Sequence, residues 1–317
     1  MSECGDFHRE VSGVRLQRVV LFGVLFWLLT PNWLLAQEIA IYARSHTQFD
    51  ERNEYPVRLL ELALKSSDAD IKLQSSEEII LQGRAINLIR NNQGVHVLWA
   101  MTSNEREREL SPIRIPIYKG LIGWRICIIH PNNVRRFSNI SSIKELRGVT
   151  FVQGHDWPDL EIFLHNGLIV ESNANYHSMF KMVEMERVDA FPRALIEIWP
   201  ELQTYSNLRA EPRLLIRYPA AVYYFVSRKN PGLYRAIKEG LEEMMENGDF
   251  TSLFNEFYMG AIAQARLQER TIIDLQNPLL PADTPLNNPR LWYANPLPRN
   301  DSGNAASAGS ADANDGN

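Results

Sequence analysis

The sequence predicts an α/β protein built from two lobes, each a mostly parallel sheet flanked by helices. Strand and helix patterns alternate over residues 38–100 and again over residues 140–191. Such alternation is typical of parallel sheets with crossover helices. Stretches containing Gly and Pro at residues 116–123 and 214–226 suit a pair of hinge strands between the lobes.

In the first unit, apolar residues recur alternately every second residue, as in strands, and every third or fourth residue, as in helices. The expected elements are a strand at 38–43, a helix at 55–66, a strand at 71–74, a helix around 81–90 and a strand at 95–100.

The second unit repeats this order. Ser142 and Glu145 form a capping box for a short helix, and Asp156 is expected to cap a helix that reaches Asn166. The remaining elements are strands at 149–153, 168–171 and 188–191 and a helix at 176–186.

An apolar strand is expected at 124–129, and Asn230 followed by Pro231 opens a long helix to Asn247. A further helix starts near Asp249. We therefore expect lobe 1 over 37–120 and 222–298, lobe 2 over 121–221, and a tail at 299–317.

The C-terminal part has a different composition. Repeated prolines between residues 275 and 298 exclude a continuous helix, while the leucines there are too apolar for free coil. This segment is expected to wrap a lobe in extended form. Residues 299–317 carry almost only small and polar side chains and are expected to be disordered.

The first 36 residues are predicted to be a cleavable signal peptide, which places the mature protein in the periplasm. Basic residues precede an apolar run at 19–29, and the small residue Ala36 ends the segment. An uncleaved membrane anchor is the alternative, because residues 19–36 approach the length of a transmembrane helix. Pro31 interrupts that stretch and favours cleavage.

Composition excludes several classes of function. A net charge of −5 does not favour binding to nucleic acid. The composition also indicates no polybasic segment that would bind anionic lipid. Only Cys127 remains after the leader, so no disulfide can form within the mature chain. Motifs typical of hydrolases, nucleotide-binding enzymes and metal sites are missing. We expect no enzyme activity, no catalytic residue, no metal site and no cofactor.

Several segments together carry a family resemblance over residues 38–258. Met101–Arg106, residues 146–154 and Arg187–Ala190 resemble landmarks of the family 3 extracytoplasmic solute-binding proteins, which have the type II periplasmic-binding-protein fold and include amino-acid receptors of ABC transporters. The resemblance implies that Arg106 grips a ligand carboxylate and that the turn after Gly154 supplies backbone N–H groups to it.

The resemblance also shows a departure. Ala194 stands where the family has an aspartate for the α-ammonium group, and the neighbouring Arg193 would repel such a group. We therefore expect a small anionic solute rather than an ordinary amino acid.

The expected ligand-binding residues are Arg44, Ser103, Arg106, His155, Trp157 and Arg193. Most have a structural alternative: Arg106 could belong to a solvated, ion-paired helix start, His155 could be a surface residue, and Arg193 could pair with Glu197. Arg44, at the end of the first strand, has the same ambiguity. Trp157 could provide a stacking platform in the cleft.

The predicted function is the binding of a small solute by hinge closure, for presentation to an inner-membrane transporter. A sensory receptor with a membrane partner, or a degenerate binding module without a transport role, are the alternatives. The expected partners are a small-molecule ligand and this membrane protein, with no nucleic acid, and the protein itself is expected to be a monomer.

Overall fold

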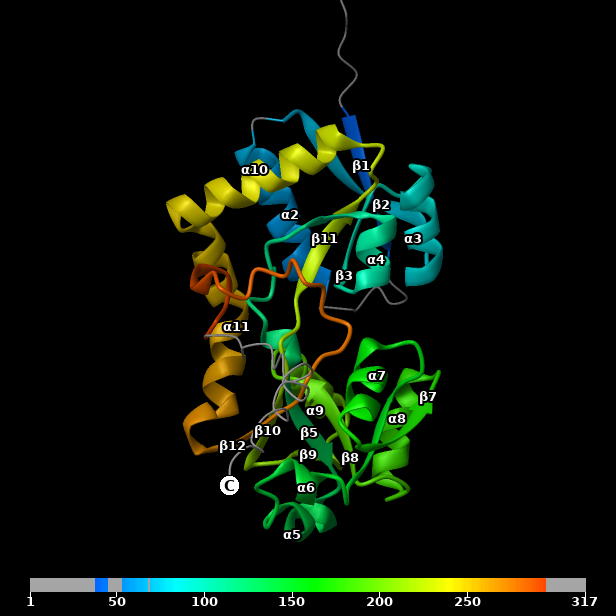
Figure 1. Ribbon diagram of the computed structural model, residues 1–317, viewed down its shortest axis with the longest axis vertical. Coiled ribbons are helices and arrows are strands. Elements are labelled where there is room, and N and C mark those ends of the chain that lie inside the picture. Colours follow the sequence, from blue (N-terminus) through cyan, green and yellow to red (C-terminus); the bar gives the residue numbers. More distant parts are fainter. Residues whose placement is uncertain (1–37, 45–52, 68, 295–317) are drawn as a thin grey trace, which may run out of the picture. The chain divides into compact units, whose positions relative to one another are not determined.

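The computed structural model describes residues 38–44, 53–67 and 69–294 (Figure 1). The predicted leader and the predicted tail lie outside the described residues. In the described part, the strands form two separate sheets flanked by helices. No described helix combines the length and the apolar character needed to cross a membrane.

The first sheet has the strand order β2-β1-β3-β11-β4. Its strands are β1 (Glu38–Arg44), β2 (Ile71–Ile79), β3 (Val97–Met101), β4 (Ser111–Ile113) and β11 (Val222–Val226). The β1 strand is parallel to β2 and β3, whereas β11 is antiparallel to β3 and β4. All five residues of β11 are buried, as expected for a strand inside a covered sheet.

The helices of this first unit follow the predicted pattern. They are α2 (Glu54–Ser66), α3 (Gln82–Asn91), α4 (Asn104–Glu109) and α10 (Pro231–Asn247). The α2 and α10 helices pack closely, because a Cβ atom on Gly240 would lie 1.8 Å from the carbonyl oxygen of Ala63. Asn230 caps α10 by accepting the N–H of Leu233, as predicted.

The second sheet has the strand order β12-β10-β5-β8-β6-β7, with β9 pairing with β5. Its strands are β5 (Trp124–Ile129), β6 (Thr150–Gly154), β7 (Ile169–Asn173), β8 (Ala190–Ala194), β9 (Arg209–Ala210), β10 (Leu214–Arg217) and β12 (Thr271–Asp274). The β6, β7 and β8 strands are parallel, and β5 runs antiparallel to β8 and β10. Both sheets are therefore mixed.

The helices of the second unit are α5 (Val134–Phe137), α6 (Ile143–Leu146), α7 (Pro158–His165), α8 (Tyr176–Glu184) and α9 (Ile198–Thr204). The capping box before α6 is present as predicted. The prediction that Asp156 caps α7 is wrong. The helix begins at Pro158, whose fixed φ suits the first helical position, and Trp157 occupies the cap position without a side-chain hydrogen bond.

Two of the connections between the sheets lie at the predicted places, and we call them the crossings. One leads from β4 to β5 and the other from β10 to β11, and they lie side by side: Tyr218 donates its N–H to the carbonyl of Gly123 at 3.1 Å, and Ile117 donates to Val222 at 3.0 Å. A side chain on Gly123 would collide with the carbonyl oxygen of Tyr218 at 2.2 Å. Glycine is therefore required where the two crossings meet.

The C-terminal part differs from its prediction. The whole of 222–298 was expected in the first lobe, but after α11 (Asp249–Ala265) residues 271–274 form β12, parallel to β10 in the second sheet. Residues 275–294, which we call the strap, then return along the crossings. Asn277 donates to the carbonyl of Pro219 at 2.9 Å, and Tyr293 donates its N–H to Lys119 at 2.9 Å. The strap, which is the last described segment of the chain, therefore forms hydrogen bonds with both crossings (Figure 1).

Candidate functional site

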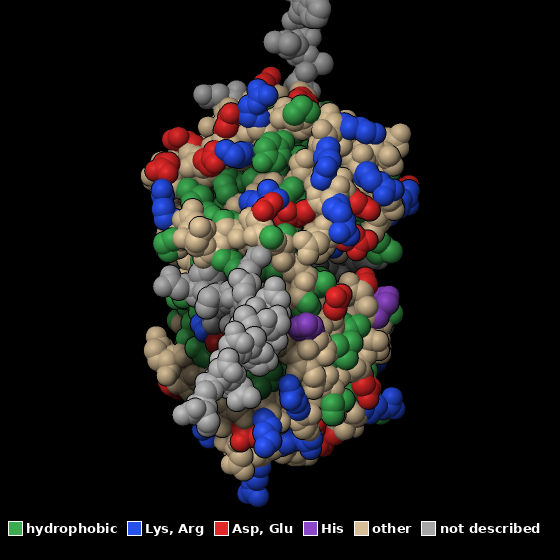
Figure 2. Space-filling model, in the orientation of Figure 1, with side chains coloured by type: hydrophobic (Ala, Val, Ile, Leu, Met, Phe, Trp, Pro, Cys, Tyr) green, Lys and Arg blue, Asp and Glu red, His purple; other side chains and the backbone are tan. Residues whose placement is uncertain are grey.

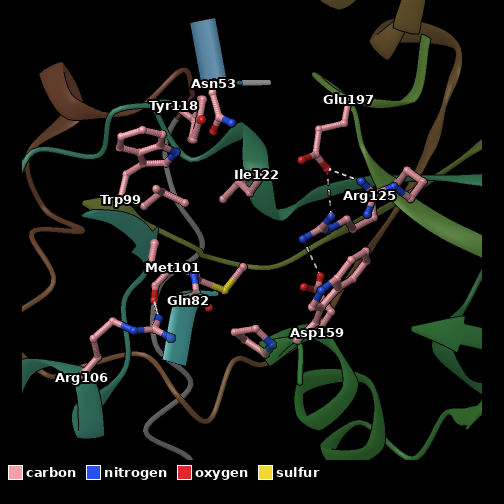
Figure 3. A pocket seen from close by; sticks show the side chains of 15 residues that line it. Asn53, Gln82, Trp99, Met101, Arg106, Tyr118, Ile122, Arg125, Asp159 and Glu197 are labelled. Carbon is pink, nitrogen blue, oxygen red and sulfur yellow. Dashed lines mark hydrogen bonds and ion pairs between the residues drawn. The ribbon is translucent and has the colours of Figure 1, made fainter. Parts of the chain in front are cut away.

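One pocket of about 290 Å³ is lined by residues from both sheets and from the crossings between them. Figure 3 shows Arg106 on one side of this pocket and Arg125, Asp159 and Glu197 on the other. Its lining residues are Asn53, Gln82, Trp99, Ala100, Met101, Arg106, Tyr118, Ile122, Arg125, Trp157, Pro158, Asp159, Arg193, Glu197 and Val222.

Arg106 supplies the cationic group on the side of the first sheet. The hydroxyl of Ser103 accepts the N–H of Arg106 at 3.1 Å and so caps the short α4 helix that carries this arginine. The guanidinium donates through Nη1 to the carbonyl of Met101, and its buried Nε has no hydrogen-bond partner in the described part of the chain. Burial lowers the pKa of Arg106, and the nearby charge of Glu105 opposes this shift.

Arg193 lies in the middle of the second sheet, on β8, and its side chain is only 2% exposed. Two carboxylates bind it. Glu201 accepts hydrogen bonds from Nε at 2.9 Å and from Nη2 at 2.7 Å, and Glu197 lies 3.0 Å from Nη2. Burial by itself would lower the pKa of Arg193, but the two carboxylates raise it well above its usual value.

Aromatic rings complete the surroundings of Arg193. Its guanidinium carbon lies 5.0 Å from the ring centroid of Trp157 and 5.1 Å from that of Phe191, both within the range of cation–π attraction. The hydroxyl of Tyr176 donates to Glu201 at 2.6 Å. The predicted alternative for Arg193, a pair with Glu197, is therefore present, and Glu201 is a second and closer partner.

Arg125, at the start of β5, forms a second buried group of charges. Its Nη2 lies 2.5 Å from a carboxylate oxygen of Asp159, and its Nε donates to the hydroxyl of Tyr218 at 2.7 Å. That hydroxyl donates in turn to Asp159. Glu197 lies 3.9 Å from Nη1 of Arg125 and 3.0 Å from Nη2 of Arg193, so this carboxylate is shared by the two arginines. Burial alone would lower the pKa of Arg125, but Asp159 and the other oxygen groups raise it overall.

The charge on the side of the second sheet is thus nearly balanced. Two guanidiniums, Arg125 and Arg193, face the three carboxylates of Asp159, Glu197 and Glu201. With Arg106 added from the other side, the numbers of positive and negative groups are equal. Glu197 is the most exposed of the carboxylates, at 19% compared with 5% for Asp159 and 8% for Glu201. A solute in the pocket would meet an incompletely hydrogen-bonded cation on one side and carboxylate oxygens on the other.

Trp157 takes a precise position at the end of β6. A Cβ atom on Gly154 would lie 2.5 Å from the indole of Trp157, so this close approach requires glycine. The ring stacks on Phe191 with centroids 6.2 Å apart and an interplanar angle of 21°. Trp99 and Tyr118 line the other side of the pocket (Figure 3).

The structure brings together three of the predicted site residues, Arg106, Trp157 and Arg193, in this pocket. Ser103 does not line it and acts as a helix cap. His155 is exposed and lies beside Asp156, and Arg44 is exposed at the end of β1.

Sequence reasoning missed Arg125, Asp159 and Glu201. Arg125 stands inside an apolar strand, where a lone charged residue is a signal of buried pairing. Its partner Asp159 is 34 positions away along the printed sequence, and no local pattern links the two. Within the described residues, no group of three or more His, Cys, Asp or Glu side chains could hold a metal ion.

Comparison with known proteins shows the fold. No protein-family model and no curated protein sequence matches the chain. Solved structures do match. They include an ancestral arginine-binding protein bound to arginine, at 14% identity and a TM-score of 0.51, with 70% of this chain and 97% of that chain covered.

A Salmonella typhimurium periplasmic binding protein with high arginine specificity matches at 13% identity and a TM-score of 0.51, covering 70% of this chain and 99% of that chain. An ancestral arginine-binding protein bound to glutamine matches at 14% identity and a TM-score of 0.51, covering 70% and 97%. The predicted fold class is confirmed: the chain has the two-sheet α/β fold of periplasmic solute-binding proteins.

Proposed function

We propose that this protein binds a small solute with a carboxylate group in the pocket between its two sheets and presents it to a membrane transporter. The observation that carries the proposal is the Arg106 guanidinium, which lines the pocket with a buried Nε that has no partner among the described residues. A buried donor without an acceptor is costly, and a carboxylate would satisfy it with a charge-assisted hydrogen bond.

The balance of charge refines the class of solute. Two arguments from the sequence opposed an α-ammonium group, Ala194 in place of an aspartate and the positive charge of Arg193. The structure bears on the second. That charge is held by Glu197 and Glu201 at hydrogen-bonding distance, so it no longer opposes a cationic group on the ligand. A zwitterion would place its carboxylate at Arg106 and its ammonium group toward the carboxylate oxygens. The proposed solute therefore has a carboxylate and can carry an ammonium group as well.

The size of the pocket supports a small ligand. About 290 Å³ lies at the lower end of the range for small-molecule sites. The solved structures of the same fold add support, because they include an ancestral arginine-binding protein bound to arginine and one bound to glutamine. Binding by this mechanism needs no chemical step: contacts from both sheets favour the conformation in which the pocket is closed around the solute.

The experiment measures the thermal stability of the purified protein with matched pairs of solutes. L-arginine is compared with agmatine, which lacks the carboxylate, and L-glutamate with glutarate, which lacks the ammonium group. A ligand present at a hundred times its Kd stabilises the protein by about 2.7 kcal/mol. We expect at least one carboxylate-bearing solute to raise the Tm, and agmatine, the decarboxylated counterpart of arginine, not to do so.

Two variants assign the effect to Arg106. Arg106→Met removes the guanidinium but keeps an unbranched apolar stem, and Arg108→Met makes the same change at an exposed position of the same helix. The ligand-dependent rise in Tm should disappear in the first variant and persist in the second. The proposal fails if agmatine stabilises the protein as well as arginine does, if no solute of the panel acts, or if both variants respond alike.

A further inference from the structure

The second sheet has a basic end on the side opposite the pocket. Pocket residues come from the first residues of β5 and from the last residues of β6 and β8 or the turns after them. The basic side chains come from the other ends of the same strands and from the loops there. Because these strands are five or six residues long, the two ends lie roughly 17 Å apart.

Seven exposed cations gather at this end, which we call the basic end. They lie on α5, on α6 and directly after it, before β8, on β9 and before β10. They are Arg135, Arg136, Lys144, Arg147, Arg187, Arg209 and Arg213. Figure 2 shows Lys and Arg side chains at the lower end of the molecule, where Figure 1 places α5 and α6, and others on the upper part.

Hydrogen bonds connect these loops into one surface. Arg213 donates to the carbonyl of Ser138 at 3.0 Å, Arg136 donates to Gly148 at 2.6 Å, and Arg147 donates to Asn166 at 3.4 Å. Arg209 pairs with Ile129 at the end of β5. The cations therefore belong to one end of the sheet although they come from distant parts of the sequence.

Fewer carboxylates than cations lie at this end: Glu145, Glu184, Glu186 and Asp189 are there, and the buried Glu211 pairs with Arg270. Asp189 lies 3.1 Å from Arg136, and Glu186 lies 3.3 Å from His130. The carboxylate of Glu145 accepts hydrogen bonds from Ser141 and Ser142. Within the described part of the chain, the other six cations have no carboxylate at ion-pair distance. This local excess of positive charge contrasts with the net charge of −5 for the whole chain, from which no polybasic contact with anionic lipid was expected.

Three exposed apolar side chains lie at the same end. Ile169 is the first residue of β7 and pairs with Thr150, the first residue of β6. Leu164 and Met185 stand at the C-terminal ends of α7 and α8, the helices that lead back to the starts of β7 and β8. These side chains are 53%, 53% and 62% exposed for Ile169, Leu164 and Met185. Exposed apolar groups among cations are typical of surfaces that contact a membrane interface.

We propose that the basic end docks on the surface of an anionic phospholipid bilayer. Arginine guanidiniums match phosphate groups with paired hydrogen bonds, and six of the seven cations are arginines. The three apolar side chains come from separate elements and can enter the headgroup region one by one. A bilayer presents phosphates over its whole surface, so it needs no shape complementarity with this end. Docking there leaves the pocket at the opposite end of the sheet open.

The test measures co-sedimentation of the purified protein with lipid vesicles. Vesicles of phosphatidylglycerol and phosphatidylcholine are compared with vesicles of phosphatidylcholine alone. We expect binding only to the anionic vesicles at about 0.1 M salt and its loss at about 1 M salt, where the Debye length falls to about 3 Å. Equal binding to both kinds of vesicle, or to neither, would overturn the proposal.

Matched charge variants locate the contact. The variant R135Q/R187Q/R209Q removes three cations from the basic end, and R84Q/R108Q/K229Q removes three exposed cations from the first unit. Each cation near an anionic surface contributes about fivefold to partitioning, so the first variant should bind about a hundredfold more weakly. The second should bind like the wild type. Equal loss in both variants would show a general effect of charge and overturn the assignment.

Two further measurements keep the result specific. All six positions are exposed, so both variants should keep the circular dichroism spectrum and Tm of the wild type. Soluble polyglutamate is then added as a competitor at the same carboxylate concentration as the lipid phosphate. If it displaces the protein from the vesicles as effectively as free anionic lipid does, the basic end binds acidic polymers in general, and the bilayer is the wrong partner.

Discussion

Replacing Glu201 with glutamine should destabilise the protein strongly, because it leaves Arg193 with a single carboxylate. Arg193 is 2% exposed and Glu201 is 8% exposed, so water cannot take the place of the lost charge. Breaking a buried ion pair by removing one partner costs about 3–5 kcal/mol. Glu197 stays at 3.0 Å from Arg193 and keeps the cost near the lower limit. We expect a loss of about 3 kcal/mol, or about 6 °C in Tm for a chain of this size.

The assay is urea unfolding followed by both far-UV circular dichroism and tryptophan fluorescence, whose midpoints must coincide for a two-state analysis. The double variant Arg193→Met with Glu201→Leu provides the control. Replacing both charges with apolar groups removes the uncompensated cation, and it should recover at least about 1 kcal/mol relative to Glu201→Gln. A loss below about 1 kcal/mol in Glu201→Gln, or a double variant less stable than the single one, would refute the reasoning from burial.

Two other predictions concern packing and pH. Gly240→Ala should lower the free energy of unfolding by about 3 kcal/mol, because the new methyl group would overlap the backbone of Ala63. Gly232→Ala, in the same helix, meets no backbone atom and should change the free energy of unfolding by less than about 1 kcal/mol. Urea unfolding measures both. His96 accepts the N–H of Ile41 at 3.0 Å, and burial lowers its pKa below the usual 6.5. The unfolded chain then binds the proton more readily, so stability from this residue is present above pH 6.5 and is lost as the pH falls toward the depressed value. The slope of the urea midpoint between about pH 7 and pH 5 should flatten in His96→Gln, and an unchanged slope would contradict the assignment.

The order of strands and helices was predictable because it depends on local signals. Asn230 and Pro231 start α10 where expected, and the capping box at Ser142 precedes α6. The start of α7 was misplaced by one residue, because Asp156 and Pro158 are competing signals and the fixed φ of proline prevailed. The role of β12 was missed because four residues pairing with a distant strand carry no local pattern that names their partner.

The candidate site was predicted only in part. Arg106 and Trp157 were found through a resemblance in the segments around them, and both line the pocket. The sequence left two roles open for Arg193, a cation that faces a ligand or a partner of Glu197. The fold encloses it between carboxylates and aromatic rings. The effect of Arg193 on a ligand depends on its pairing with Glu201. That pairing depends on the path of the turn after β8, which no local sequence pattern specifies.

Charge shows the same division between sequence and structure. The sequence by itself determined the net charge, the alternation of elements and hence the α/β class, because each follows from composition or from patterns within a few residues. Only the tertiary structure decided which charges meet. It buries Arg125 against Asp159 beside the pocket and gathers Arg135, Arg187 and Arg209 at the opposite end of the same sheet. Such contacts join residues far apart in the chain, so they depend on strand order, which no local pattern specifies.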